Sequence, residues 1–130
     1  MVSAHLADLA IVLCRLAAIA LASIGVLALI APERLARSYG IEVHERAALA
    51  FVRATGARDV LIGLILAGAA YLQDAIVLAG LCIVGVLLSL ADFAIAFTFA
   101  RRFRSEHLAH IGGAVGFALI TALLLSLIRR

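Results

Sequence analysis

The chain has 130 residues, 66% of them apolar, and a mean hydropathy of +1.21. Because soluble domains are only about 45–50% apolar, this composition excludes an ordinary soluble globular domain. The net charge is +3, but no polar stretch is long enough to form a soluble basic surface, so nucleic acid is not an expected partner.

Apolar stretches of about 20 residues or more can cross the roughly 30 Å hydrocarbon layer of a membrane. The sequence contains such stretches at residues 6–30, 47–72, 75–100 and 107–128. Short polar segments separate them, at residues 32–46, 73–74 and 101–106. We therefore predict an all-α fold, an antiparallel four-transmembrane-helix bundle in which residues 1–130 form a single integral membrane domain.

The arginine distribution predicts an orientation. Six arginines lie in the first and third connections, none lies in the second, and two end the chain. The positive-inside rule therefore places the two basic connections in the cytoplasm and both termini outside. The first apolar stretch follows no Lys or Arg and is too long for a cleaved signal, so we expect an uncleaved helix. Rich Ala, Leu and Arg usage without Lys is typical of GC-rich bacteria and predicts the bacterial cytoplasmic (inner) membrane.

The segment FVRATGARDVLIGL, residues 51–64, carries charge inside an apolar stretch. At about 100° per residue, Arg53, Gly56, Asp59 and Gly63 form one sloping ridge, whereas Arg58 is turned toward a different neighbour. A central Arg or Asp costs about 2.5–3.5 kcal/mol on insertion, and a buried pair is often no more stable than an apolar replacement. Stability therefore explains these charges poorly, and we predict that Arg58 and Asp59 are paired, face inward and have a functional role.

Depth along the helices, at about 1.5 Å per residue, groups the other polar side chains. Arg53, Asp92 and His110 form a set in the cytoplasmic half, and Arg15 joins Arg58 and Asp59 near the middle of the membrane. The simpler interpretation of Arg53 is that it extends to the lipid headgroups. An imidazole can move a proton near neutral pH, and a carboxyl group can act as its proton-exchanging partner. The candidate catalytic residues are therefore Asp59, Asp92 and His110, and the candidate substrate-binding residues are Arg53, Arg58 and Arg15.

Histidine and cysteine give weaker signals. His107 and His110 share a helix face, but no second cluster supports a metal site, so none is predicted and His107 is expected at the membrane interface. Cys14 and Cys82 lie in separate spans without a Cys-x-x-Cys motif, which is typical of small packing residues.

Glycine spacing points to close helix contacts. The Gly112-x-x-x-Gly116 pattern permits near approach, either to the face that bears Gly56 and Gly63 or to a second protomer. Glycine beside buried charge also leaves volume for a pocket between the second, third and fourth spans. Residues 32–46 have two open interpretations, a short amphipathic helix with a turn at Gly40 or a solvated linker.

The combination SYGIEV followed by FVRATGARDVLIGL resembles a family of small bacterial and fungal four-span membrane proteins, the domain-of-unknown-function family 4267. More remotely the chain resembles DoxX-like membrane proteins. The resemblance covers nearly the whole chain and is most specific at Arg53-x-x-Gly56-Ala57-Arg58-Asp59-x-x-x-Gly63. It implies a four-span bundle with a polar site at those positions, and it implies no reaction.

Three functions fit these residues. In the first, the protein binds or converts a lipophilic small molecule by cofactor-free proton transfer, as in isomerisation, cyclisation or epoxide opening, with arginines that orient an oxygen-bearing substrate. The second is a small oligomeric proton or anion transporter or channel. The third is a structural assembly subunit in which charge and glycine fix helix register. Lipid is the expected surrounding in each, and a homodimer or higher homo-oligomer fits the second and third.

Overall fold

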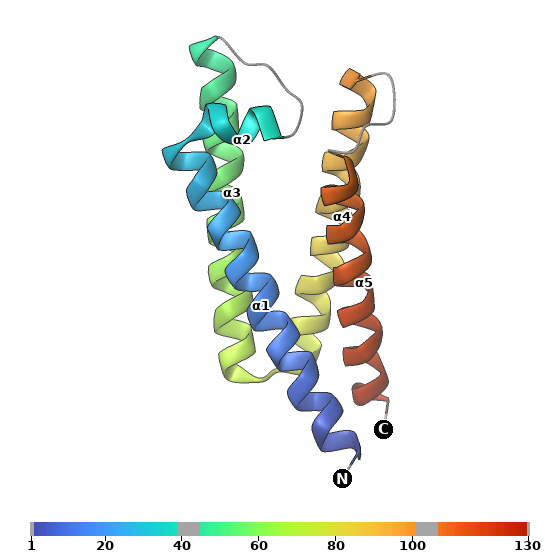
Figure 1. Cartoon of the computed structure of the whole chain (residues 1–130). Coiled ribbons are helices and arrows are strands. Elements are labelled where there is room, and N and C mark those ends of the chain that lie inside the picture. The colour runs from blue at the N-terminus through green and yellow to red at the C-terminus, as the bar shows by residue number, and fades with distance from the viewer. Residues whose placement is uncertain (1, 39–44, 101–106, 130) are drawn as a thin grey trace. The chain divides into compact units, whose positions relative to one another are not determined.

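The structure, a computed structural model, describes residues 2–38, 45–100 and 107–129 (Figure 1). These residues form five α-helices, α1 (Val2–Ile30), α2 (Pro32–Ser38), α3 (Arg46–Leu72), α4 (Ala75–Ala100) and α5 (Leu108–Ile128). The all-α prediction is confirmed, and the four long helices begin and end close to the four predicted apolar stretches. The chain divides into two compact units, the α1–α3 unit (residues 15–68) and the α4–α5 unit (residues 1–14 and 69–130).

Three of the helices are long and apolar enough to cross a membrane. Within the described residues these segments are His5–Ile30, Ala75–Thr98 and Leu108–Ile128. The fourth long helix, α3, has 27 residues but carries three arginines and an aspartate. The structure therefore contains three candidate membrane spans, and the crossing by α3 stays a prediction.

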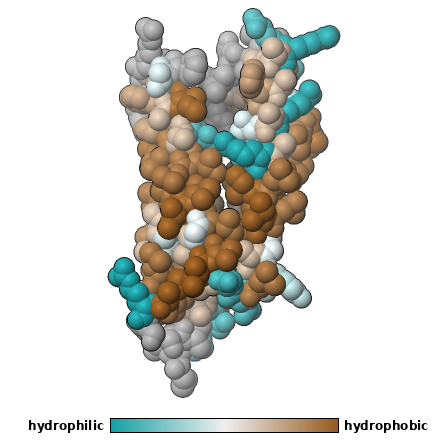
Figure 2. Space-filling model, turned by 180° about the vertical axis from the view of Figure 1, so that it is seen from behind, coloured by the Kyte–Doolittle hydropathy of each residue, from teal (hydrophilic) through white to brown (hydrophobic). Residues whose placement is uncertain are grey.

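Along α1 small side chains lie inside and large apolar side chains lie outside, the reverse of a soluble protein. Ala10, Cys14 and Ala18 on α1 are 0–2% exposed, whereas Leu16 and Ile19 on the same helix are 57% and 63% exposed. Brown apolar side chains cover most of the surface in the view of Figure 2, and teal hydrophilic side chains gather mainly toward helix ends. Such an apolar surface is stable only against lipid, so the chain is a membrane protein.

Glycine brings α1 and α3 into backbone contact within the α1–α3 unit. A Cβ atom added at Gly25 would lie 2.6 Å from the carbonyl oxygen of Gly56, and one added at Gly63 would lie 2.9 Å from the carbonyl oxygen of Ala18. Since residue numbers rise on α1 as they fall on α3, the two helices are antiparallel. The predicted ridge of Gly56 and Gly63 therefore packs against α1.

The prediction that Gly112 and Gly116 pack against the face of Gly56 and Gly63 is wrong. The face of Gly56 and Gly63 is covered by α1, so it is not available to α5. A Cβ added at Gly112 or Gly116 would meet no atom within 4 Å among the described residues. The alternative use of this face, by a second protomer, stays a prediction.

The reversal between α3 and α4 is confirmed at the predicted residues. Helix α3 ends at Leu72, and Gln73 adopts a left-handed backbone with φ of 58°. The Asp74 Oδ1 atom then accepts hydrogen bonds from the backbone N–H groups of Ile76 and Val77, at 3.0 and 3.1 Å. Asp74 thus caps the first turn of α4, whose N–H groups have no partner within the helix.

An antiparallel seam joins α4 and α5. The ring of Phe117 fills the space beside Gly85, and the Ser89 hydroxyl lies 2.9 Å from the position of a Cβ at Gly113. Fully or nearly fully buried residues continue this register along both helices, Leu78 and Cys82 on α4 and Ile120 and Leu124 on α5. Their alternating spacing of three and four residues is that of coiled-coil packing.

The first connection begins as a helix. Pro32 occupies the first position of α2, where a missing N–H costs nothing, and Pro32 and Ala36 are buried. This outcome favours the helical interpretation over the solvated linker for residues 32–38. The predicted turn at Gly40 and the third connection, residues 101–106, lie outside the described residues.

Candidate functional site

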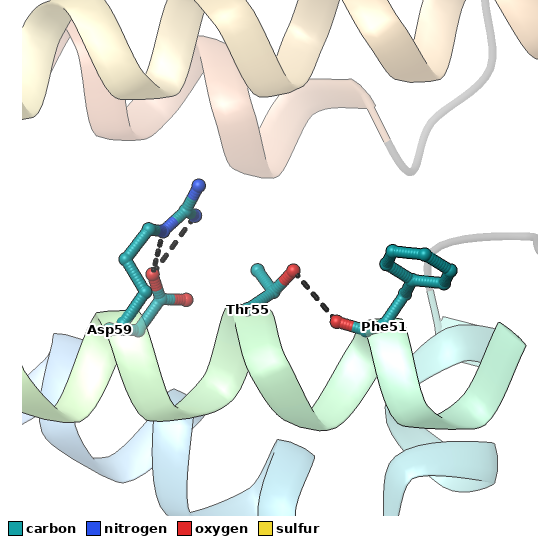
Figure 3. A network of polar contacts seen from close by, with 4 residues as sticks. Phe51, Thr55 and Asp59 are labelled. Carbon is teal, nitrogen blue, oxygen red and sulfur yellow. Dashed lines mark hydrogen bonds and ion pairs between the residues drawn. The ribbon is translucent and has the colours of Figure 1, made fainter. Parts of the chain in front are cut away.

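Arg58 and Asp59 form an ion pair on α3 (Figure 3). The Arg58 Nε–H donates to Asp59 Oδ1 at 3.0 Å, and one terminal guanidinium nitrogen lies 3.0 Å from the same oxygen. The Asp59 side chain is 15% exposed and that of Arg58 is 36% exposed. Each charge therefore meets an opposite charge on the same helix, at the positions where the sequence predicted functional charges.

The pairing corrects the predicted direction of Arg58. Helix geometry places the Cα–Cβ bonds of residues 58 and 59 about 100° apart, which predicted separate neighbours. The long Arg58 side chain instead bends toward Asp59, because a nearby carboxylate stabilises the guanidinium. The angle at Cβ does not fix the position of a charge at the end of four rotatable bonds.

Other polar residues of the α1–α3 unit offer less chemistry. The Thr55 hydroxyl donates to the Phe51 carbonyl oxygen at 3.1 Å, so its hydrogen is used within α3 (Figure 3). Arg53 and Arg15 also belong to the α1–α3 unit, and both side chains are exposed. The ion pair joins Arg58 and Asp59, two members of the predicted mid-membrane set.

Asp92 and His110 come together in the α4–α5 unit. Both are half-buried, and the Asp92 carboxylate acts electrostatically on the His110 ring. Asp92 lies three residues after Ser89 on α4, and His110 lies three residues before Gly113 on α5, so both occupy the next positions of the antiparallel seam. A carboxylate and an imidazole therefore stand where a coiled-coil seam ordinarily places apolar side chains.

His107 is buried among aromatic side chains, and its predicted depth at the membrane interface stays a prediction. Its side chain is 3% exposed, and its ring lies edge-on to Phe93 and Phe97 at centroid distances of 5.8 and 6.0 Å. The two phenylalanines stack on each other at 5.8 Å. His107 also acts electrostatically on His110. The spacing of the phenylalanines, one helical turn apart and directly before the third connection, was the available sequence signal for this cluster.

The predicted site residues thus fall into two groups. Asp92 and His110 lie in the α4–α5 unit, and Arg15, Arg53, Arg58 and Asp59 lie in the α1–α3 unit. The predicted association of Arg53 with Asp92 and His110 stays a prediction. Among the described residues, no three His, Cys, Asp or Glu side chains gather closely enough to hold a metal ion.

An apolar hollow of about 280 Å³ lies between α4 and α5, on their outer surface. Its lining comes from both helices: Ile83, Val86, Leu87, Ala118, Thr121, Ala122 and Leu125. The Thr121 hydroxyl donates to the Phe117 carbonyl oxygen at 2.8 Å, so the one polar side chain in the lining is satisfied by its own helix. This hollow is apolar and offers no side chain for acid–base chemistry.

Comparison with known protein families identifies the family of this chain. The family model for the domain of unknown function DUF4267 matches residues 18–125. The chain belongs to this family. The matched part of the DUF4267 chain includes both polar pairs, Arg58–Asp59 and Asp92–His110. No curated protein and no solved structure matches it, and the more remote likeness to DoxX-like proteins stays a prediction.

Proposed function

We propose that this DUF4267 protein is a four-span protein of the bacterial inner membrane that binds a lipophilic, oxygen-bearing small molecule and exchanges a proton with it. The observation that carries the proposal is the Asp92–His110 pair in the α4–α5 seam. A carboxylate beside an imidazole is the usual equipment for general acid–base catalysis, and it requires no cofactor.

The fourth span of this proposal is α3. Gly56 and Gly63 contact α1 residues that belong to the candidate span His5–Ile30, so the middle of α3 lies beside a membrane-crossing helix. The Arg58–Asp59 ion pair offsets part of the cost of placing two charges there, because each neutralises the other within one helix. The orientation with both termini outside is part of the same proposal and rests on the arginine distribution.

A seam position is an expensive place for a polar pair that has only a structural role. Replacing a buried ion pair with apolar residues is often neutral or stabilising, so an all-apolar seam would hold α4 and α5 together at least as well. In our proposal His110 and Asp92 instead pass a proton to and from the bound molecule. Isomerisation, cyclisation and epoxide opening are the reaction types that need only such a transfer.

The α1–α3 unit supplies the other proposed roles. The Arg58 guanidinium, still 36% exposed beside Asp59, presents N–H donors to an oxygen-bearing group. Arg53 and Arg15 are proposed to bind substrate, and Asp59 is proposed as a further proton-exchanging carboxyl group. An assembly role is a second candidate function, favoured by the open α5 face at Gly112 and Gly116, where a second protomer would pack.

Native mass spectrometry of protein purified from its own membranes tests the proposal. We expect wild type to carry a co-purified lipophile that is lost from Asp92→Asn and from His110→Gln. Asp74→Asn is the matched control, because Asp74 is an exposed carboxylate at the start of α4, the helix that also carries Asp92. Thermal unfolding of each variant separates loss of binding from loss of the fold. A wild-type protein without any lipophile, or variants that change stability alone, would remove the basis of the proposal.

A further inference from the structure

The two cysteines of the chain meet inside the membrane-spanning helices, although they are far apart in the sequence. Cys14 lies on α1 and Cys82 on α4, and both belong to the α4–α5 unit. The Cys14 and Cys82 thiol groups are hydrogen-bond partners. The sequence predicted only packing roles for these residues, since no Cys-x-x-Cys motif is present. The fold supplies the proximity that the motif would otherwise give.

Their depth in the membrane is consistent with this contact. At about 1.5 Å per residue, Cys14 lies about 14 Å from His5, the start of its span, and Cys82 lies about 10 Å from Ala75, the start of the other. Both starts are expected at the outer membrane surface, because the termini and the second connection are predicted outside. Counting residues along α1 and along α4 thus places the two sulfur atoms at a similar depth.

The surroundings of the thiols are apolar. Both cysteines are 0% exposed, and their neighbours one helical turn away, Ala10 and Leu78, are also 0% exposed. A water-soluble oxidant has no direct path to such a site, whereas a molecule dissolved in the lipid reaches the helix surface from the hydrocarbon side.

We propose that Cys14 and Cys82 form a dithiol site that lipophilic hydroperoxides oxidise to a disulfide. One sulfur attacks the O–O bond of the hydroperoxide and becomes a sulfenic acid, as the peroxide leaves as an alcohol. The second sulfur displaces the hydroxyl group as water, and the S–S bond forms. Two electrons and two protons pass from the thiols to the peroxide. The sulfur atoms, already within hydrogen-bonding distance, then lie about 2.05 Å apart.

The test uses the full chain in lipid nanodiscs, with cumene hydroperoxide as the lipophilic oxidant and hydrogen peroxide as the aqueous one. Free thiols are counted by maleimide labelling after denaturation, and the intact mass is measured. We expect both thiols to disappear together, with a mass loss of about 2 Da for two hydrogen atoms and recovery of both thiols with a phosphine reductant. Cumene hydroperoxide should act several-fold faster than hydrogen peroxide.

Cys14→Ser and Cys82→Ser are the matched variants, and neither should lose mass by oxidation. Peptide mapping of oxidised wild type should identify the Cys14–Cys82 crosslink, so the outcome does not depend on the variants folding. Thiols that stay reduced, a gain of about 16 Da that stops at sulfenic acid, disulfide-linked dimers, or equal rates with the two peroxides would each overturn the proposal.

Discussion

A single methyl group at Gly25 should weaken the contact between α1 and α3. The added Cβ would lie 2.6 Å from the carbonyl oxygen of Gly56 and 2.7 Å from the backbone nitrogen of Val60. Both obstacles are backbone atoms, which cannot rotate away, so the two helices must separate by several tenths of an ångström. Overpacking of this kind costs about 1–3 kcal/mol, and a gap of about 0.5–1 Å loses a quarter to a half of each dispersion contact.

Helix propensity opposes this cost. Alanine is more favourable than glycine in a helix by up to about 1 kcal/mol, so Gly25→Ala should lower the free energy of unfolding by about 1–2 kcal/mol. The measurement is SDS-induced unfolding in mixed micelles, followed by circular dichroism. Gly68→Ala is the matched control, because a Cβ at Gly68 on α3 meets no atom within 4 Å among the described residues. This control should be neutral or stabilising, and equal losses in the two variants would refute the close contact.

The same unfolding measurement checks the remaining structural predictions. Asp74→Ala removes the cap of α4 and should cost about 1 kcal/mol, whereas Gln73→Gly should stabilise by about 0.5–1 kcal/mol, because glycine adopts the left-handed backbone without strain. No change in either variant would contradict this turn geometry. Arg58→Gln and Asp59→Asn should each lower the free energy of unfolding by more than half of the loss in the double variant, because either change removes the whole ion pair. The two single losses should therefore add up to more than the loss in the double variant, by a coupling energy of about 0.5–3 kcal/mol. Strict additivity would show that the ion pair does not form in the membrane.

Hydropathy and helix punctuation predicted the helices well. The long apolar stretches specify four helices, and the Gln73–Asp74 joint gives both the left-handed residue and the capping carboxylate that end one helix and begin the next. Local chemistry decides these features, so the sequence contains them directly. The small residues that pack inside and the large ones that face lipid also follow from the membrane environment.

Partners between helices were harder to predict, because they depend on which faces meet. The ridge of Gly56 and Gly63 was identified, but its true partner, Gly25 on α1, was not, since glycine carries no signal for a particular neighbour. The burial of His107 depends on Phe93 and Phe97, which lie on the other side of the third connection. Distance in sequence conceals such contacts.

In the candidate site, too, some features could be predicted from the sequence and others could not. Residue type and depth selected Asp92 and His110, and the antiparallel seam of α4 and α5 explains why they meet. The Arg58 side chain was misplaced because its direction was taken from its Cβ alone, and a flexible side chain follows the nearest carboxylate. Charge complementarity between adjacent residues was the better guide.

Proton exchange at Asp92 and His110 is the central claim, and isotope uptake measures it most directly. The lipophile that co-purifies with wild type is incubated with the protein in deuterated water, re-extracted and weighed by mass spectrometry. We predict carbon-bound deuterium in the presence of wild type and of Asp74→Asn, and none with Asp92→Asn or without protein. A lipophile that gains no carbon-bound deuterium and is not otherwise converted, or that changes equally with Asp92→Asn, would contradict the assignment of acid–base chemistry to this seam.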